Sequence, residues 1–165
     1  MIRDVKPVLD MTDSLFDEAL DDKRLLRPSF LTQHQYAARV FPDVLDKDEF
    51  ERLAAAGQTG EPIIIHHGEF GAPEEMMACD GVDNAWKSLF EVSHEDIILE
   101  FAHSSLFAWI PAGERLYVVF GPQGMIASLG EATELKQAFD EYVEESGLTE
   151  QGKRFLLGAY ERYTL

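Results

Sequence analysis

Basic residues are scarce in this chain, and they are distributed unevenly. The 165 residues include 14 Lys and Arg against 31 Asp and Glu, which gives a formal net charge of −17. Between Arg52 and Arg115 the only basic residue is Lys87. Nucleic-acid binding depends on Lys and Arg that displace counterions from phosphates, so we expect no direct contact with nucleic acid. The same repulsion argues against binding to an anionic membrane surface.

Long apolar runs and paired cysteines are missing as well. No apolar stretch approaches the ~18 residues that a membrane-spanning helix needs. The first residues, Met1–Lys6, do not contain the apolar core of a signal peptide. The single cysteine, Cys79, has no partner for an internal disulfide. Together these features predict a cytoplasmic protein that makes no use of a membrane.

The chain contains no recognisable catalytic, cofactor or metal motif. Gly121–Gly124 lacks the Lys-Ser/Thr ending of a phosphate-binding loop. Cys79 follows an apolar stretch and has acidic neighbours, which disfavour a reactive thiolate. Glu74 and Glu75 follow Pro73, a pattern that favours a helix N-terminus over a pair of acid–base carboxylates. We therefore predict no catalytic residue, no cofactor and no metal ligand.

Two adjacent histidines carry the alternative interpretation. His66, His67 and Glu69 follow a predicted strand and have side chains that zinc accepts as ligands. Neighbouring residues of a strand point to opposite faces, so the two imidazoles converge on one ion only if the backbone bends. A small metal-dependent hydrolase that uses these three residues is the alternative to a binding protein.

Helical spacing of apolar residues covers both ends of the chain. Asp46 and Glu49 resemble a capping box, and Gly57 stands where that helix ends. The segment 94–103 fits a helix that begins after Ser93, or a strand around Ile97–Leu99, and we favour the helix. The spacing predicts helices over 13–22, from Thr32 to Pro42, over 46–57, 83–91 and 94–103, from Thr133 to Gly147, and from Thr149 onward.

Strand signals concentrate in the middle of the chain. Pro62–His66 is a β-branched run between turns, and three further apolar runs at 105–110, 115–120 and 125–129 are separated by turns of about four residues. Loops this short connect antiparallel strands only. The sequence therefore predicts a single α+β domain over 1–165, with a small antiparallel sheet (a meander at about 105–129) packed against N-terminal and C-terminal helices.

The acidic excess is greatest in the middle third. Residues 56–110 contain ten acidic residues and one basic residue. If these carboxylates share a face, the face attracts cations, and Trp86 or Trp109 beside them is a candidate aromatic anchor. The predicted partner-binding residues are Glu61, Glu69, Glu74, Glu75, Asp80, Asp83, Glu91, Glu95, Asp96, Glu100, Trp86 and Trp109.

A strongly acidic surface steers basic proteins toward it and accelerates their encounter. The expected partner is a basic protein such as a toxin or nuclease domain, whose groove receives phosphates and so accepts carboxylates. We therefore predict a protein of the immunity class, which inhibits a bacterial toxin by covering its active site. A non-inhibitory adaptor protein is the second alternative.

Overall fold

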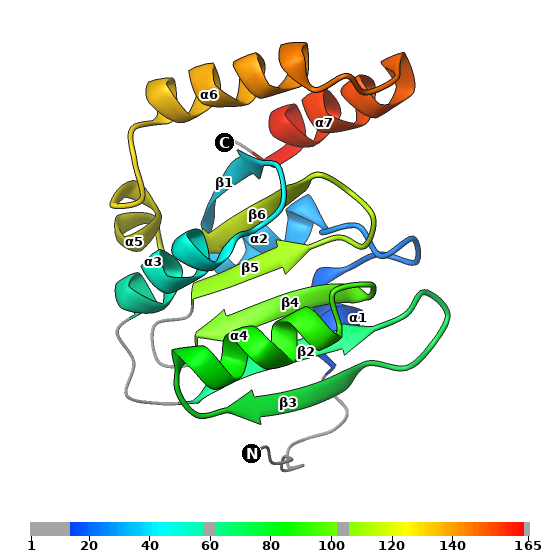
Figure 1. Cartoon of the computed structure of the whole chain (residues 1–165), viewed down its shortest axis with the longest axis vertical. Coiled ribbons are helices and arrows are strands. Elements are labelled where there is room, and N and C mark those ends of the chain that lie inside the picture. Colours follow the sequence, from blue (N-terminus) through cyan, green and yellow to red (C-terminus); the bar gives the residue numbers. More distant parts are fainter. Residues whose placement is uncertain (1–13, 58–61, 102–105, 164–165) are drawn as a thin grey trace.

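The computed structural model describes residues 14–57, 62–101 and 106–163, which form a six-stranded sheet with helices on both faces (Figure 1). Every pair of neighbouring strands is antiparallel, in the order β1-β6-β5-β4-β2-β3. This arrangement confirms the α+β prediction. The strands are β1 (Ala37–Pro42), β2 (Ile63–Gly68), β3 (Glu75–Cys79), β4 (Asp96–Phe101), β5 (Leu106–Ile110) and β6 (Leu116–Gly121).

The helices divide into two layers, each with its own hydrophobic core. One face of the sheet packs against α3 (Lys47–Gly57), α4 (Val82–Glu91) and α5 (Gln123–Ala127). The other packs against α1 (Leu15–Ala19), α2 (Pro28–His34), α6 (Ala132–Glu145) and α7 (Glu150–Tyr163). We call the latter the α1 face. Among the described residues, no helix has the length and apolar character to cross a membrane.

The meander consists of β4, β5 and β6, so it spans 96–121 rather than 105–129. The helix favoured over 94–103 is wrong: Asp96–Phe101 is the central strand β4. Ile97 and Leu99 enter one core and Ile98 the other, so three apolar residues in succession obscure the alternation of the strand, although Asp96 and Glu100 share a face with Ile98. The strand expected at 125–129 is also wrong, because a helix, α5, follows Pro122 there.

The helix expected from Thr32 to Pro42 is wrong from Gln35 onward. Helix α2 ends at His34, and Gln35 adopts a left-handed backbone with φ of 59°. The chain then forms β1, which pairs with β6. The predicted helices at 46–57 and 83–91, and the two C-terminal helices, are confirmed as α3, α4, α6 and α7.

Candidate functional site

A cleft opens on the α1 face, where the described helices leave the β2–β3 end of the sheet partly uncovered. Its volume is about 1180 Å³. The segment from Ser14 to Arg27 forms one wall, and the β2–β3 loop (69–74) forms the opposite wall. Six carboxylates and two guanidinium groups line it, namely Asp17, Glu18, Asp21, Asp22, Glu74, Glu100, Arg24 and Arg27.

His66 lies at the base of this cleft between two of the carboxylates. Its Nδ1 is 2.7 Å from Glu74 Oε2, and its Nε2 is 2.7 Å from Glu100 Oε1. The second oxygen of Glu74 accepts hydrogen bonds from the Ser14 hydroxyl and, at 3.0 Å, from the Phe16 backbone N–H. These contacts join α1 to strands β2 and β4 through His66 and the two carboxylates.

The two carboxylates determine the charge of His66. A carboxylate accepts hydrogen bonds, so an imidazole between two of them must carry a hydrogen on each nitrogen. Burial lowers the pKa of His66, but the hydrogen bonds and negative charges of Glu100 and Glu74 outweigh it, and the pKa is raised above its usual value. Burial raises the pKa of Glu74, and the bonds from His66, Ser14 and Phe16 outweigh it, so that pKa is lowered. Because both nitrogens are engaged, His66 is a structural cation and not a free general base.

Arg24 fixes the two walls of the cleft to each other. Its guanidinium donates to the carbonyl oxygens of Gly68 at 3.2 Å and Ala72 at 2.6 Å. The same group lies 3.7 Å from Asp96 Oδ2 at the start of β4. Arg27 is also engaged, because its Nε donates to the Leu20 carbonyl. Both arginines therefore direct hydrogen bonds into the protein. Five of the six carboxylates (Asp17, Glu18, Asp21, Asp22 and Glu100) are exposed or half-buried, whereas the side chain of Glu74 is 9% exposed.

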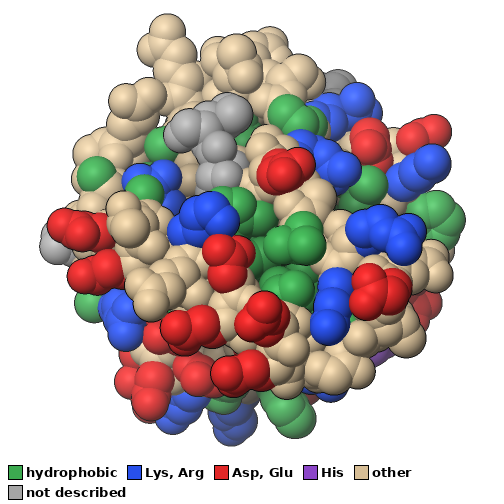
Figure 2. All heavy atoms as spheres, turned by 90° about the horizontal axis from the view of Figure 1, so that it is seen from above, with side chains coloured by type: hydrophobic (Ala, Val, Ile, Leu, Met, Phe, Trp, Pro, Cys, Tyr) green, Lys and Arg blue, Asp and Glu red, His purple; other side chains and the backbone are tan. Residues whose placement is uncertain are grey.

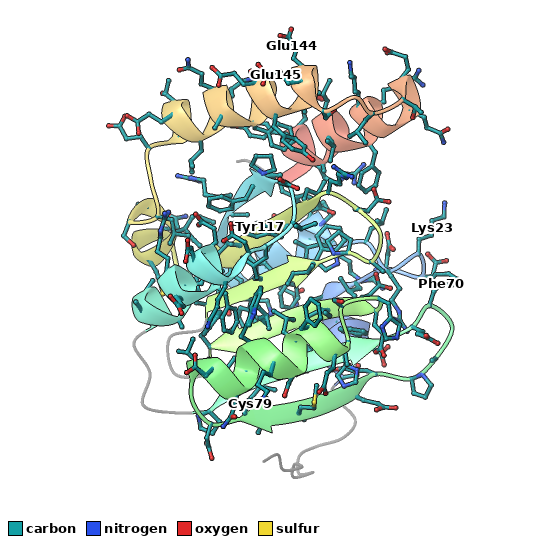
Figure 3. All side chains as sticks on the ribbon, in the orientation of Figure 1. Lys23, Phe70, Cys79, Tyr117, Glu144 and Glu145 are labelled. Atoms are coloured by element: carbon teal, nitrogen blue, oxygen red, sulfur yellow. The ribbon has the colours of Figure 1, made fainter. Side chains whose placement is uncertain are left out.

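Apolar side chains complete the mouth of the cleft. Phe70, in the β2–β3 loop, is 70% exposed, and Met76 of β3 is 39% exposed. In Figure 3, Phe70 projects outward at the same end of the molecule as Lys23 of the α1–α2 turn. An exposed aromatic ring beside carboxylates is a common composition for a protein-binding surface.

His67 does not belong to this site. It lies on the opposite face of the sheet, where its Nδ1 donates to Glu95 Oε1 at 2.7 Å. Glu69 is 3.6 Å from the exposed His94 instead. The three residues of the alternative hydrolase therefore do not converge. Among the described residues, no group of three or more His, Cys, Asp or Glu side chains is arranged to hold a metal.

The structure brings together only some of the predicted binding residues. Glu74 and Glu100 meet in the cleft, and Glu95 and Asp96 bond to His67 and Arg24. The helix start expected at Glu74–Glu75 is wrong, because Glu75 begins β3. The remaining described acids are exposed on the β2–β3 loop, on β3, in the turn after β3 and on α4, and they are Glu69, Glu75, Asp80, Asp83 and Glu91. Glu61 is outside the described residues.

Neither tryptophan side chain is exposed on the surface in the way that an aromatic anchor requires. Trp109 is 1% exposed and packs against Tyr163 in the core. Trp86 is half-buried against Phe50. Two aromatic rings beside acids are each 70% exposed, Phe70 after Glu69 and Phe90 before Glu91. Of these two, Phe70 lines the cleft, and the sequence analysis did not select it. Since Phe70 is a single apolar residue between Glu69 and Gly71, no periodic pattern marks it.

Cys79 is buried at the end of β3, beneath α4 (Figure 3). Burial raises the pKa of its thiol, and the nearby Asp80 carboxylate acts in the same direction. The thiol is therefore protonated at neutral pH, as the sequence predicted from its apolar and acidic neighbours.

The acids of the α1 wall were also missed. Phe16, Ala19 and Leu20 face the core, which leaves Asp17 and Glu18 on the outer side of α1. The sequence shows this amphipathic pattern, but not that the polar side faces a loop some fifty residues away.

Comparison of the chain with models of known families, with curated proteins and with solved structures finds no match.

Proposed function

We propose that this chain is a binding protein that neutralises a basic protein partner, in the manner of an immunity protein that covers the active site of a toxin. The observation that supports this proposal is the acid-lined cleft on the α1 face, in which six carboxylates accompany two arginines that bond to the chain itself. A cationic loop or side chain of the partner is the group that fits such a cleft.

Charge and shape both favour a cation here. Carboxylates in a concave surface with low-dielectric walls concentrate the negative potential and raise the local concentration of cations. The net charge of −17 extends that attraction beyond the cleft. A nuclease toxin presents Lys and Arg in a groove that receives phosphates, and carboxylates at the mouth of the cleft compete for the same groups.

Phe70 adds binding energy that charge alone does not provide. A ring that is 70% exposed loses its contact with water when a partner covers it. Burying an aromatic side chain contributes roughly 2 kcal/mol. We expect Phe70 to control the dissociation rate, and the carboxylates of the rim to control the association rate.

Two matched variants test the proposal. The partner is first captured from an extract of the source organism on the immobilised protein, and it is then identified and purified. The rate of its association with the protein is measured by stopped flow at 50 and 300 mM salt. The cleft variant Asp17→Asn with Glu18→Gln removes two exposed charges. We expect association to slow about 10-fold at low salt, because the rim charges steer the encounter.

The control variant Glu144→Gln with Glu145→Gln removes the same charge from α6, which lies at the top of the view, away from Phe70 at its right edge (Figure 3). Acidic and basic side chains are interspersed on the face over α6 and α7 (Figure 2). The control should therefore slow association less than 2-fold. The captured partner should be basic and should lose its activity in an equimolar mixture. A partner that stays active when saturated supports the adaptor alternative, and equal effects of the two variants contradict a role for the cleft.

A further inference from the structure

The sheet has one edge that the described elements leave open. Strand β1, at one end of the sheet, packs against α5, α6 and α7. Strand β3, at the other end, pairs with β2 and packs against α4. No described strand pairs with the outer side of β3 (Figure 1). An edge of this kind presents unpaired backbone N–H and C=O groups to an incoming strand.

Strand β3 lacks the usual protection of an edge. Its five residues, Glu75–Cys79, contain no lysine and no proline, and each residue pairs with one residue of β2 without a bulge. Met76 is exposed on the α1 face, opposite His66 and beside the cleft. Glu75 is exposed on the other face. Met77 and Cys79 share that face and pack into the core beneath α4, so a strand added here meets an apolar α1 face and, on the other face, the one exposed carboxylate of Glu75.

We infer that β3 is a docking edge for an extended segment of the basic partner, which adds a seventh strand and alternates Lys or Arg with apolar residues. Apolar side chains of that segment lie over Met76 and Ala78, next to the cleft, and its basic side chains lie beside Glu75. Main-chain hydrogen bonds supply affinity, and the alternating side chains supply specificity. The inference rests on the proposed function, because it gives the mode by which that partner binds.

Charge also determines which strand can occupy this edge. A second copy of the chain could pair its β3 antiparallel to the first, but that would bring the exposed acids at the two ends of β3, Glu75 and Asp80, of both copies to one interface. Like charges opposed across two strands are destabilising, and two molecules of charge −17 repel at long range. A basic strand experiences the reverse of both effects, so the acids at the ends of β3 exclude self-pairing and favour a cationic partner.

A defined peptide tests this inference separately from the proposed function. The probe is a fluorescently labelled ten-residue peptide of alternating Val and Lys, and the control peptide carries Pro in place of two central Val residues. Both have the same charge, but proline cannot donate to a ladder. We expect the Val-Lys peptide to bind at least 10-fold more tightly by fluorescence anisotropy, and to slow amide exchange at Met76–Ala78 by at least 10-fold.

Two exposed apolar positions provide matched variants. Met76→Lys places a cation on the edge and should lower the affinity for the Val-Lys peptide at least 10-fold. Leu157→Lys on α7 should change the affinity for the same peptide less than 2-fold. The exchange measurement uses the unaltered protein, so it is independent of the folding of either variant. Equal binding of both peptides would overturn strand addition and leave the attraction for basic partners intact. Absence of peptide binding, or a stable dimer of the free protein on sedimentation, would also overturn it.

Discussion

His66→Gln is expected to destabilise the protein by about 3 kcal/mol at pH 7, as removal of one member of a buried, paired set of charges typically does. The side chains of His66 and Glu74 are 6% and 9% exposed. Glutamine carries both of its N–H donors on one nitrogen, so it cannot reproduce the two opposed bonds of the imidazole. It also carries no charge, so nothing offsets the repulsion between Glu74 and Glu100. Urea unfolding followed by circular dichroism gives the free energy of unfolding for both proteins.

The pH dependence of this loss has a definite sign. The pKa of His66 is raised in the folded protein, so its stabilisation is complete below its unfolded value of 6.5 and is lost as the pH rises through the folded value. The pKa of Glu74 is lowered, so its stabilisation is present above 4.5 and is lost as the pH falls through the folded value. The difference in the free energy of unfolding between wild type and His66→Gln should therefore be largest between pH 4.5 and pH 6.5. It should become smaller above pH 6.5.

Two further variants isolate the cause. His94 is exposed, with 61% of its side chain in water, so His94→Gln should change the free energy of unfolding by less than about 0.5 kcal/mol. Adding Glu100→Gln to His66→Gln removes one of the repelling charges and should restore about 1 kcal/mol. A loss that is the same at every pH would show that His66 contributes packing alone.

The distribution of apolar residues was enough to predict the fold class and most helices, but not the central strand. Helices α3, α6 and α7 each have a polar side in water, so their periodicity is visible in the sequence. Strand β4 is buried on both faces, and its apolar run fits a helix equally well. Without β4, the meander was placed too far along the chain.

The candidate site depended on that missing strand. His66 and Glu100 are 34 positions apart in the sequence, and they meet because β2 pairs with β4. The sequence identified His66, Glu74 and Glu100 as polar residues of interest, but it assigned His66 to the alternative metal site and both glutamates to the partner-binding surface. The alternation rule correctly placed His66 and His67 on opposite faces, because that argument needed only the strand β2 and no knowledge of its neighbours.

Arg24→Ala is expected to lower the free energy of unfolding by about 3 kcal/mol and to weaken the connection between the two walls of the cleft. The variant loses the hydrogen bonds to the Gly68 and Ala72 carbonyl oxygens, and it leaves Asp96 buried without its cation. Asp96 keeps one bond, from the Ala112 backbone N–H at 2.9 Å. Because the β2–β3 loop loses its attachment to the α1–α2 turn, its amides should exchange faster even under conditions where the protein stays folded.

The backbone of Arg24 allows side-chain and main-chain effects to be separated. Its φ of 64° lies in the left-handed region, which costs a residue with a Cβ about 1 kcal/mol and costs glycine nothing. Arg24→Gly should therefore be about 1 kcal/mol more stable than Arg24→Ala, although both lack the guanidinium. Lys23→Ala, at the exposed neighbouring position, should be within about 0.5 kcal/mol of wild type. If Arg24→Ala were as stable as Lys23→Ala, the guanidinium would not connect the two walls, and the shape of the cleft would depend on the packing of α1 alone.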